Sequence, residues 1–175
     1  MIKLSQASIT NQEISEVKKV LKKQYLGMGE NVFEFEKKLK NFLKKEVLCV
    51  NTGTSALQLA LESLRFPLNS EVLVPTITYV ASYQAITASG LKPIPCDVNL
   101  NNLIIDLDDA KNRITKNTKC IMPVYFAGEP GNIDQIYEFA KKNKLRIIED
   151  AAHAFGSKYK NKLIGSIGDI TCFSF

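Results

Sequence analysis

The sequence predicts an α/β fold of three layers, in which helices cover both faces of a mainly parallel β-sheet. From residue 47 onward, short runs rich in β-forming residues alternate with helical patterns at intervals of roughly 25 residues. Neither a repeat nor a low-complexity segment nor a linker interrupts this alternation. Such an order is typical of βαβ units, whose crossover helices leave successive strands parallel to one another.

Six runs have the length and composition of strands in this sheet. They span residues 47–50, 71–75, 92–98, 119–124, 146–150 and 169–175. Between the last two runs, residues 156–168 are polar and contain Asn161 near their middle, which predicts a hairpin or an irregular excursion.

The helices between these runs are indicated by their caps. The segment TSALQLALESL follows the first run, and TYVASYQAITAS extends to Gly90, a residue type that often follows the last residue of a helix. Asp106 and Asn132 can cap the next two helices through their side-chain oxygens.

Two amphipathic helices precede the first strand. Thr10 and Glu13 make a capping box for the first helix, and Asn31 can cap the second. Each helix has one apolar face, made by Ile14, Val17 and Leu21 in the first and by Val32, Phe35, Leu39 and Phe42 in the second. We therefore divide the chain into a helical segment for packing at residues 1–45 and βα units at residues 46–175.

Composition narrows the range of functions. With 175 residues, of which 45% are hydrophobic and 23% charged, the chain is typical of one globular domain. The net charge of +5 comes from lysines spread along helical segments, so we expect no nucleic-acid partner. No apolar run approaches the roughly 18 residues of a membrane helix, and the first residues lack the apolar core of a signal peptide. We expect a cytoplasmic protein without a membrane partner.

The cysteines indicate neither a metal site nor a disulfide framework. Each lies inside an apolar run, and no two of them form a C-x-x-C pair. We interpret all four as small buried hydrophobic residues, namely Cys49, Cys96, Cys120 and Cys172.

Several predicted strands are followed by residues that could bind a ligand, at the edge where open α/β sheets bind theirs. Gly53, Thr54 and Ser55 begin a helix and could cradle a phosphate, although the same residues also make an ordinary capped helix start. Tyr79 follows the second strand, where its ring could stack on a flat ligand or belong to the core.

The fifth strand ends in two acids, Glu149 and Asp150. A buried acid needs a cation or several hydrogen-bond donors, so at least one of the two should meet such partners, although capping of the following segment is the simpler reading. His153, the only histidine, could make a local hydrogen bond. Ser174 has no G-x-S-x-G motif around it, so we do not expect it to be the nucleophile of a hydrolase.

Together, a phosphate cradle, a stacking ring, a buried carboxylate and a hydroxyl at one sheet edge suit a planar phosphorylated cation. Neither G-x-G-x-x-G nor G-x-x-x-x-G-K-[ST] occurs, which argues against a dinucleotide or a Walker-type nucleotide site.

The order of motifs resembles the DegT/StrS-type sugar aminotransferases, which are fold-type I enzymes dependent on pyridoxal 5′-phosphate (PLP). The resemblance covers essentially the whole chain and is carried by NTGTSALQLAL, EVLVPTITYVAS, KPIPCDV, PVYFAGEPGNID, EDAAHAFG and GDITCFSF. It implies that the chain is the amino-terminal part of the large PLP-binding domain of such an enzyme.

The resemblance also implies a role for each strand-end residue. Asp150 matches the aspartate that pairs with the pyridine nitrogen, and His153 matches a residue near the phenolic oxygen of the ring, so these two are the expected catalytic residues. Tyr79 matches the stacking aromatic residue. The expected phosphate-binding residues are Gly53, Thr54, Ser55 and Ser174.

Such enzymes transfer an amino group, typically from glutamate, to a keto carbon of a nucleotide-linked sugar for polysaccharide synthesis, and they work as homodimers. Their Schiff-base lysine follows Ser174 by a few residues, beyond Phe175, as does an antiparallel strand that lies between residues 47–50 and 169–175. We therefore expect a fragment that is marginally stable and inactive alone. A sugar dehydratase of the same family, with histidine in place of lysine, and a noncatalytic cofactor-binding or partner-pairing module are the alternatives; a generic nucleotide binder is the least favoured.

Overall fold

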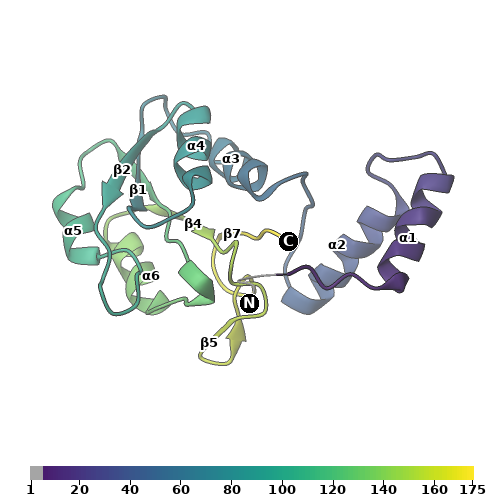
Figure 1. The fold of residues 1–175 in the computed structure, drawn as a ribbon. Helices are drawn as coiled ribbons and strands as arrows, with labels where there is room; N and C mark the ends of the chain where they lie inside the picture. The colour runs from purple at the N-terminus through teal and green to yellow at the C-terminus, as the bar shows by residue number, and fades with distance from the viewer. Residues whose placement is uncertain (1–5) are drawn as a thin grey trace.

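The computed structural model describes residues 6–175 and contains a five-stranded sheet in the order β2-β1-β3-β4-β7. Every neighbouring pair in this sheet is parallel, which confirms the predicted α/β class (Figure 1). The strands are β1 (Glu71–Pro75), β2 (Lys92–Cys96), β3 (Thr118–Ile121), β4 (Arg146–Asp150) and β7 (Ile170–Cys172).

Helices cover both faces of the sheet, as predicted. One face packs against α3 (Gly53–Ser63) and α4 (Val80–Ala88), and the other against α5 (Leu107–Asn112) and α6 (Ile133–Lys142). Side chains alternate along each strand, so Val72 and Val74 of β1 join the first core and Leu73 joins the second. The two cores and the sheet between them make the three layers.

Residues 47–50 form no strand, which corrects the first predicted element. Within residues 6–175 no strand forms a β-ladder with this segment. Leu48 is 74% exposed, and the N–H of Cys49 donates to a side chain instead, Glu36 Oε1, at 2.7 Å. A strand exists only through a ladder partner, and the composition of VLCV does not supply one. A groove of about 800 Å³ separates this segment from β7, the last strand in the sheet order.

Three other strands are shorter than predicted. Beyond Cys96, the backbone of Val98 forms only an isolated antiparallel bridge with Ile105. Beyond Ile121, Val124 forms a single parallel bridge with Asp150, after Pro123, which has no N–H to donate. The ladder of β7 ends at Cys172 rather than at Phe175, whose ring packs edge-on against Phe35 of the second helix with 5.8 Å between centroids.

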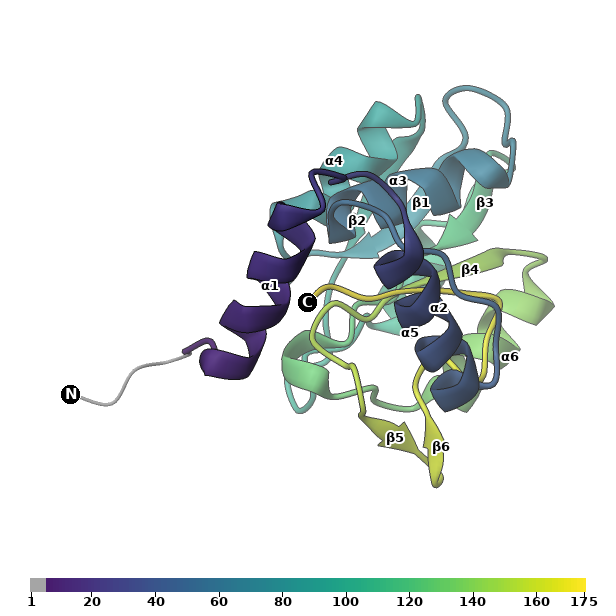
Figure 2. The same cartoon turned by 90° about the vertical axis from the view of Figure 1, so that its right-hand side faces the viewer.

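The two amino-terminal helices are α1 (Asn11–Lys22) and α2 (Glu30–Leu43). The capping box of α1 is confirmed, since Thr10 N–H donates to Glu13 Oε2 at 2.7 Å. The cap of α2 is Gly29 and not Asn31, because the helix begins one residue before the asparagine. No residue of α1 is buried, and this helix lies on the outer side of α2, away from the sheet (Figures 1 and 2).

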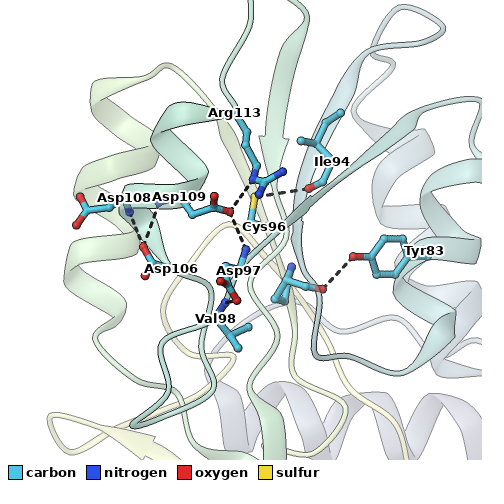
Figure 3. Close-up of polar contacts among 10 residues, drawn as sticks. Tyr83, Ile94, Cys96, Asp97, Val98, Asp106, Asp108, Asp109 and Arg113 are labelled. Carbon is cyan, nitrogen blue, oxygen red and sulfur yellow. Dashed lines mark hydrogen bonds and ion pairs between the residues drawn. The ribbon is translucent and has the colours of Figure 1, made fainter.

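The predicted caps of the later helices are confirmed. Gly90 has φ +71° just after the C-cap of α4, Asp106 accepts from the N–H groups at the start of α5, and Asn132 accepts from Gln135 N–H at 3.3 Å. In Figure 3, Asp109 of α5 accepts hydrogen bonds from Arg113 and from the backbone of Asp97, tying α5 to the segment after β2. The hydrogen bond from Arg113 lowers the pKa of Asp109.

The polar excursion is a hairpin of β5 (Lys158–Tyr159) and β6 (Lys162–Leu163). Its two turn residues, Lys160 and Asn161, have φ values of +45° and +64°, the left-handed pair of a type I′ turn. Within residues 6–175, no helix is both long and apolar enough to cross a membrane, and no group of three or more metal-ligating side chains gathers.

Candidate functional site

The candidate site lies at the carboxyl ends of β4 and β7 and at the first turns of α3 and α4. Asp150, the last residue of β4, is opposite Cys172 of β7 and is only 6% exposed. Its Oδ2 accepts from the Ser82 hydroxyl at 2.7 Å, and its Oδ1 accepts from the Ala152 N–H at 3.3 Å. No cation among residues 6–175 forms an ion pair with this carboxylate. The buried carboxylate at the carboxyl end of β4 is thus held by two neutral donors.

Ser82 is held in turn by Thr78, which stands in the turn between β1 and α4. Ser82 is fully buried, and its hydroxyl lies 2.6 Å from the hydroxyl of Thr78. Tyr79 follows Thr78 as the N-cap residue of α4 and is 75% exposed. The reading of Tyr79 as a core residue is therefore wrong, and its ring stands in solvent at the start of the helix that carries Ser82, one of the two donors to Asp150.

The first turn of α3 begins at Thr52, a residue that the sequence prediction did not select. The Thr52 hydroxyl accepts from Ser55 N–H at 3.0 Å and lies 3.0 Å from the Ser55 hydroxyl. Among residues 6–175, the N–H groups of Gly53 and Thr54 find no acceptor. The cap thus engages the amide of Ser55 and leaves two amides at the positive end of the helix for an anion.

Ser174 lies directly against this helix start. An added Cβ on Gly53 would stand 3.0 Å from Ser174 Cβ and 3.1 Å from its Oγ, so only glycine fits there without movement. Ser174 follows Cys172, whose carbonyl accepts from Ala151 N–H at 2.9 Å, next to Asp150. The end of β7 therefore connects the carboxylate with the first turn of α3.

His153 is exposed on the segment after β4. Its Nδ1 accepts from the Ala127 N–H at 3.4 Å, and its ring meets Phe126 edge-on at 6.1 Å between centroids. Since Nδ1 is an acceptor, the neutral ring carries its proton on Nε2. Ala127 has φ +53°, a backbone conformation that alanine rarely adopts.

Glu149 points to the opposite face of the sheet from Asp150 and is fully buried. Its Oε1 accepts from Tyr125 at 2.5 Å and from Tyr137 at 2.7 Å, and its Oε2 accepts from Thr171. Burial, and secondly the negative charge of Glu149, raise the pKa of both tyrosines, so the phenols remain donors. The prediction that one of the two acids meets several donors is confirmed for Glu149.

Sequence reasoning missed the cap of α3 and the partners of both acids. Thr52 carries the usual signal of an N-cap, a hydroxyl residue before an apolar helix, and could have been found. The partners Ser82 of α4, Tyr125 of the segment after β3 and Tyr137 of α6 could not, because no local pattern links these residues to the end of β4. These contacts exist only once the helices pack on the sheet.

Comparisons with known proteins agree with this arrangement. Residues 7–175 match the model of the DegT/DnrJ/EryC1/StrS aminotransferase family. The chain is 40% identical over 177 residues to GDP-perosamine synthase of Escherichia coli O157:H7. This alignment covers 99% of this chain and 48% of the synthase. It is 37% identical over 168 residues to the spore coat polysaccharide biosynthesis protein SpsC of Bacillus subtilis, covering 95% of this chain and 43% of the relative.

Among solved structures, the PLP form of Spr1654 from Streptococcus pneumoniae superposes with a TM-score of 0.94 at 34% identity, over 99% of this chain and 48% of that one. The chain spans about half the length of the curated relatives it matches. A family match over nearly all residues, with the same fold, leaves one assignment: the chain belongs to the DegT/DnrJ/EryC1/StrS aminotransferase family.

Proposed function

We propose that the chain supplies the cofactor-binding half of a PLP-dependent enzyme that transfers an amino group from an amino acid, with glutamate as donor, to a nucleotide-linked keto sugar. The observation that carries this proposal is the buried carboxylate of Asp150 beside a helix start with two amides that no acceptor among residues 6–175 engages. The names of the relatives, a GDP-perosamine synthase and a polysaccharide biosynthesis protein, support the class of substrate.

The environment of Asp150 fits a pyridine nitrogen. A carboxylate that is 6% exposed and has two neutral donors among the described residues retains lone pairs for a further partner. A protonated ring nitrogen would provide both a donor and a positive charge. By accepting that hydrogen bond, Asp150 would hold a proton on the ring nitrogen.

The first turn of α3 fits a phosphate. The N–H groups of Gly53 and Thr54 and the hydroxyls of Ser55 and Ser174 provide neutral donors, and the helix end adds partial positive charge. A side chain at Gly53 would occupy the space next to Ser174, so glycine keeps this cradle open.

Tyr79 and His153 complete the set of contacts with the ring. The phenol of Tyr79 stands in solvent at the start of α4, where it can stack on a ring held by Asp150. Because Ala127 occupies Nδ1 of His153, the Nε2–H is the group that can donate to the phenolic oxygen of PLP.

When bound, PLP supplies an electron sink that acidifies the carbon bearing the amino group. Asp150 would maintain the charge on the ring nitrogen that makes this sink effective, and His153 would donate a hydrogen bond to the phenolic oxygen. We assign the lysine that carries the substrate proton to no residue of this chain. We place the intact enzyme in the cytoplasm, in polysaccharide synthesis, as a homodimer; the exposed apolar stripe of α1, with Ile14, Val17 and Leu21, is available for such a contact.

Equilibrium dialysis of pyridoxamine 5′-phosphate tests the proposal, since this form has no aldehyde to react with surface lysines. The chain should bind it, inorganic phosphate should compete, and Asp150→Ala should weaken binding at least about tenfold. Equal binding by the chain and by Asp150→Ala would remove the basis of the cofactor assignment.

A further inference from the structure

Two hydroxyl residues outside the expected set of cofactor contacts are linked to Asp150. Ser82 is fully buried in the first turn of α4, and its hydroxyl donates to Asp150 Oδ2 at 2.7 Å, across 68 residues of sequence. Thr78 lies 2.6 Å from the Ser82 hydroxyl and is part of the turn that presents Tyr79.

The direction of these hydrogen bonds is fixed by the carboxylate. An ionised carboxylate can only accept, so the single hydroxyl proton of Ser82 is used toward Asp150, and Ser82 must accept from Thr78. A hydroxyl that accepts one hydrogen bond becomes a better donor in the next, so the pair strengthens the contact with Asp150 Oδ2.

We propose that Ser82, supported by Thr78, is the positioning residue for Asp150: it binds Oδ2 and leaves Oδ1 directed toward the ring nitrogen of the cofactor. This inference rests on the proposed function. Among residues 6–175, Oδ1 accepts only the longer bond from Ala152 N–H, at 3.3 Å, so it is the oxygen with capacity for the ring. Since Thr78 adjoins Tyr79, the same turn sets both the carboxylate and the stacking ring.

The test uses the whole chain and two ligands, pyridoxamine 5′-phosphate and its 1-deaza analogue, in which C–H replaces the ring nitrogen. Ser82→Ala should weaken binding of the first about tenfold and change binding of the second by less than about twofold, because only the first uses the oriented carboxylate. Ser82→Thr keeps the hydroxyl and should restore the preference for the ring nitrogen.

Two further variants separate positioning from stability. Thr78→Val leaves the direct hydrogen bond from Ser82 to Asp150 in place. It should weaken binding of pyridoxamine 5′-phosphate about threefold, less than Ser82→Ala does, and leave binding of the 1-deaza analogue nearly unchanged. Ser89→Ala, at the C-cap of the same helix, removes a hydroxyl that donates to the carbonyls of Ala85 and Gln58 and should alter neither affinity. Thermal melts of each variant without ligand report any general loss of structure.

Three outcomes overturn the inference. An equal loss of both ligands in Ser82→Ala indicates a merely structural serine, and unchanged affinity for both indicates that Asp150 needs no such support. Wild-type chain that does not distinguish the two ligands refutes the pairing of Asp150 with the ring nitrogen, and so refutes the proposed function together with this inference. Only the first two outcomes leave that function standing.

Discussion

Gly53 and Ser174 stand so close that a single added carbon on Gly53 would lie 3.0 Å from Ser174 Cβ. The contact joins the first turn of α3 to the end of β7 without a covalent or hydrogen-bonded link. The backbone conformation of Gly53 does not require a glycine, because its φ is not positive. The close approach of Ser174 is therefore the reason that a glycine begins this helix.

Gly53→Ala should therefore push Ser174 away from the amides of α3. We expect the affinity for pyridoxamine 5′-phosphate and for inorganic phosphate to fall by a similar factor, about tenfold, because both ligands use the same donors. Isothermal titration calorimetry measures both. Gly27→Ala is the control, since its added Cβ meets neighbours at 3.4 Å or more, and it should bind as the wild type does. Undiminished phosphate binding by Gly53→Ala would place the anion elsewhere.

Glu149→Ala should be among the most destabilising substitutions in the chain. It removes the acceptor for three hydroxyls in a buried site and leaves Tyr125, Tyr137 and Thr171 without their partner. We expect a loss of about 3 kcal/mol in the free energy of unfolding, measured in urea.

Glu149→Gln retains one acceptor oxygen and should lose less than Glu149→Ala. Glu138→Ala, on the exposed side of α6, should stay within about 0.5 kcal/mol of the wild type. If all three variants unfold at the same urea concentration, the hydroxyl contacts of Glu149 contribute nothing to stability.

The positions of the strands between Glu71 and Asp150 could be predicted from local signals, although the carboxyl ends of β2 and β3 could not. The runs 71–75 and 146–150 match the observed strands residue for residue. The cap residues Asp106 and Asn132 indicate where the helices between strands begin. Residues 47–50 have the same apolar composition but no ladder partner among residues 6–175, and composition alone cannot report a missing partner.

The site was predictable only in part, for the same reason. Strand ends mark where Asp150 and Ser174 lie, since the carboxyl ends of parallel strands meet at one edge. The hydroxyl that binds Asp150 comes from Ser82, which is distant in sequence, and the donor to His153 is a backbone amide, which no residue type reveals. Packing creates these contacts, and no pattern in the sequence encodes them locally.

Alkaline unfolding should depend on Tyr125. Burial, and secondly the charge of Glu149, raise the pKa of this phenol above that of the unfolded chain, which is about 10. The unfolded state therefore loses its proton first as the pH rises, so the stability present below pH 10 is lost above it, by about 1.4 kcal/mol per pH unit for this group.

Urea unfolding at a series of pH values between 9 and about 11 measures this slope. Tyr125→Phe has no phenol to ionise, so it should be less stable than the wild type near neutral pH but should show a shallower decline above pH 10. The difference between the two curves removes the contribution of lysines and other groups common to both. Parallel curves would mean that the phenol of Tyr125 titrates alike in folded and unfolded chains.

Thiol labelling should distinguish Cys49 from the other three cysteines. Cys96, Cys120 and Cys172 are buried, and burial raises their pKa to about 11, about 12 and about 12. In the folded chain near pH 8, a reagent therefore cannot reach these thiols, and they are not in the reactive thiolate form. Cys49 is half-buried in the segment before α3. A disulfide reagent should react with one thiol in the native chain and with four in urea, and Cys49→Ser should abolish the native reaction. Rapid labelling of Cys172 would instead show that β7 separates readily from β4, which would weaken the site built on Asp150 and Ser174.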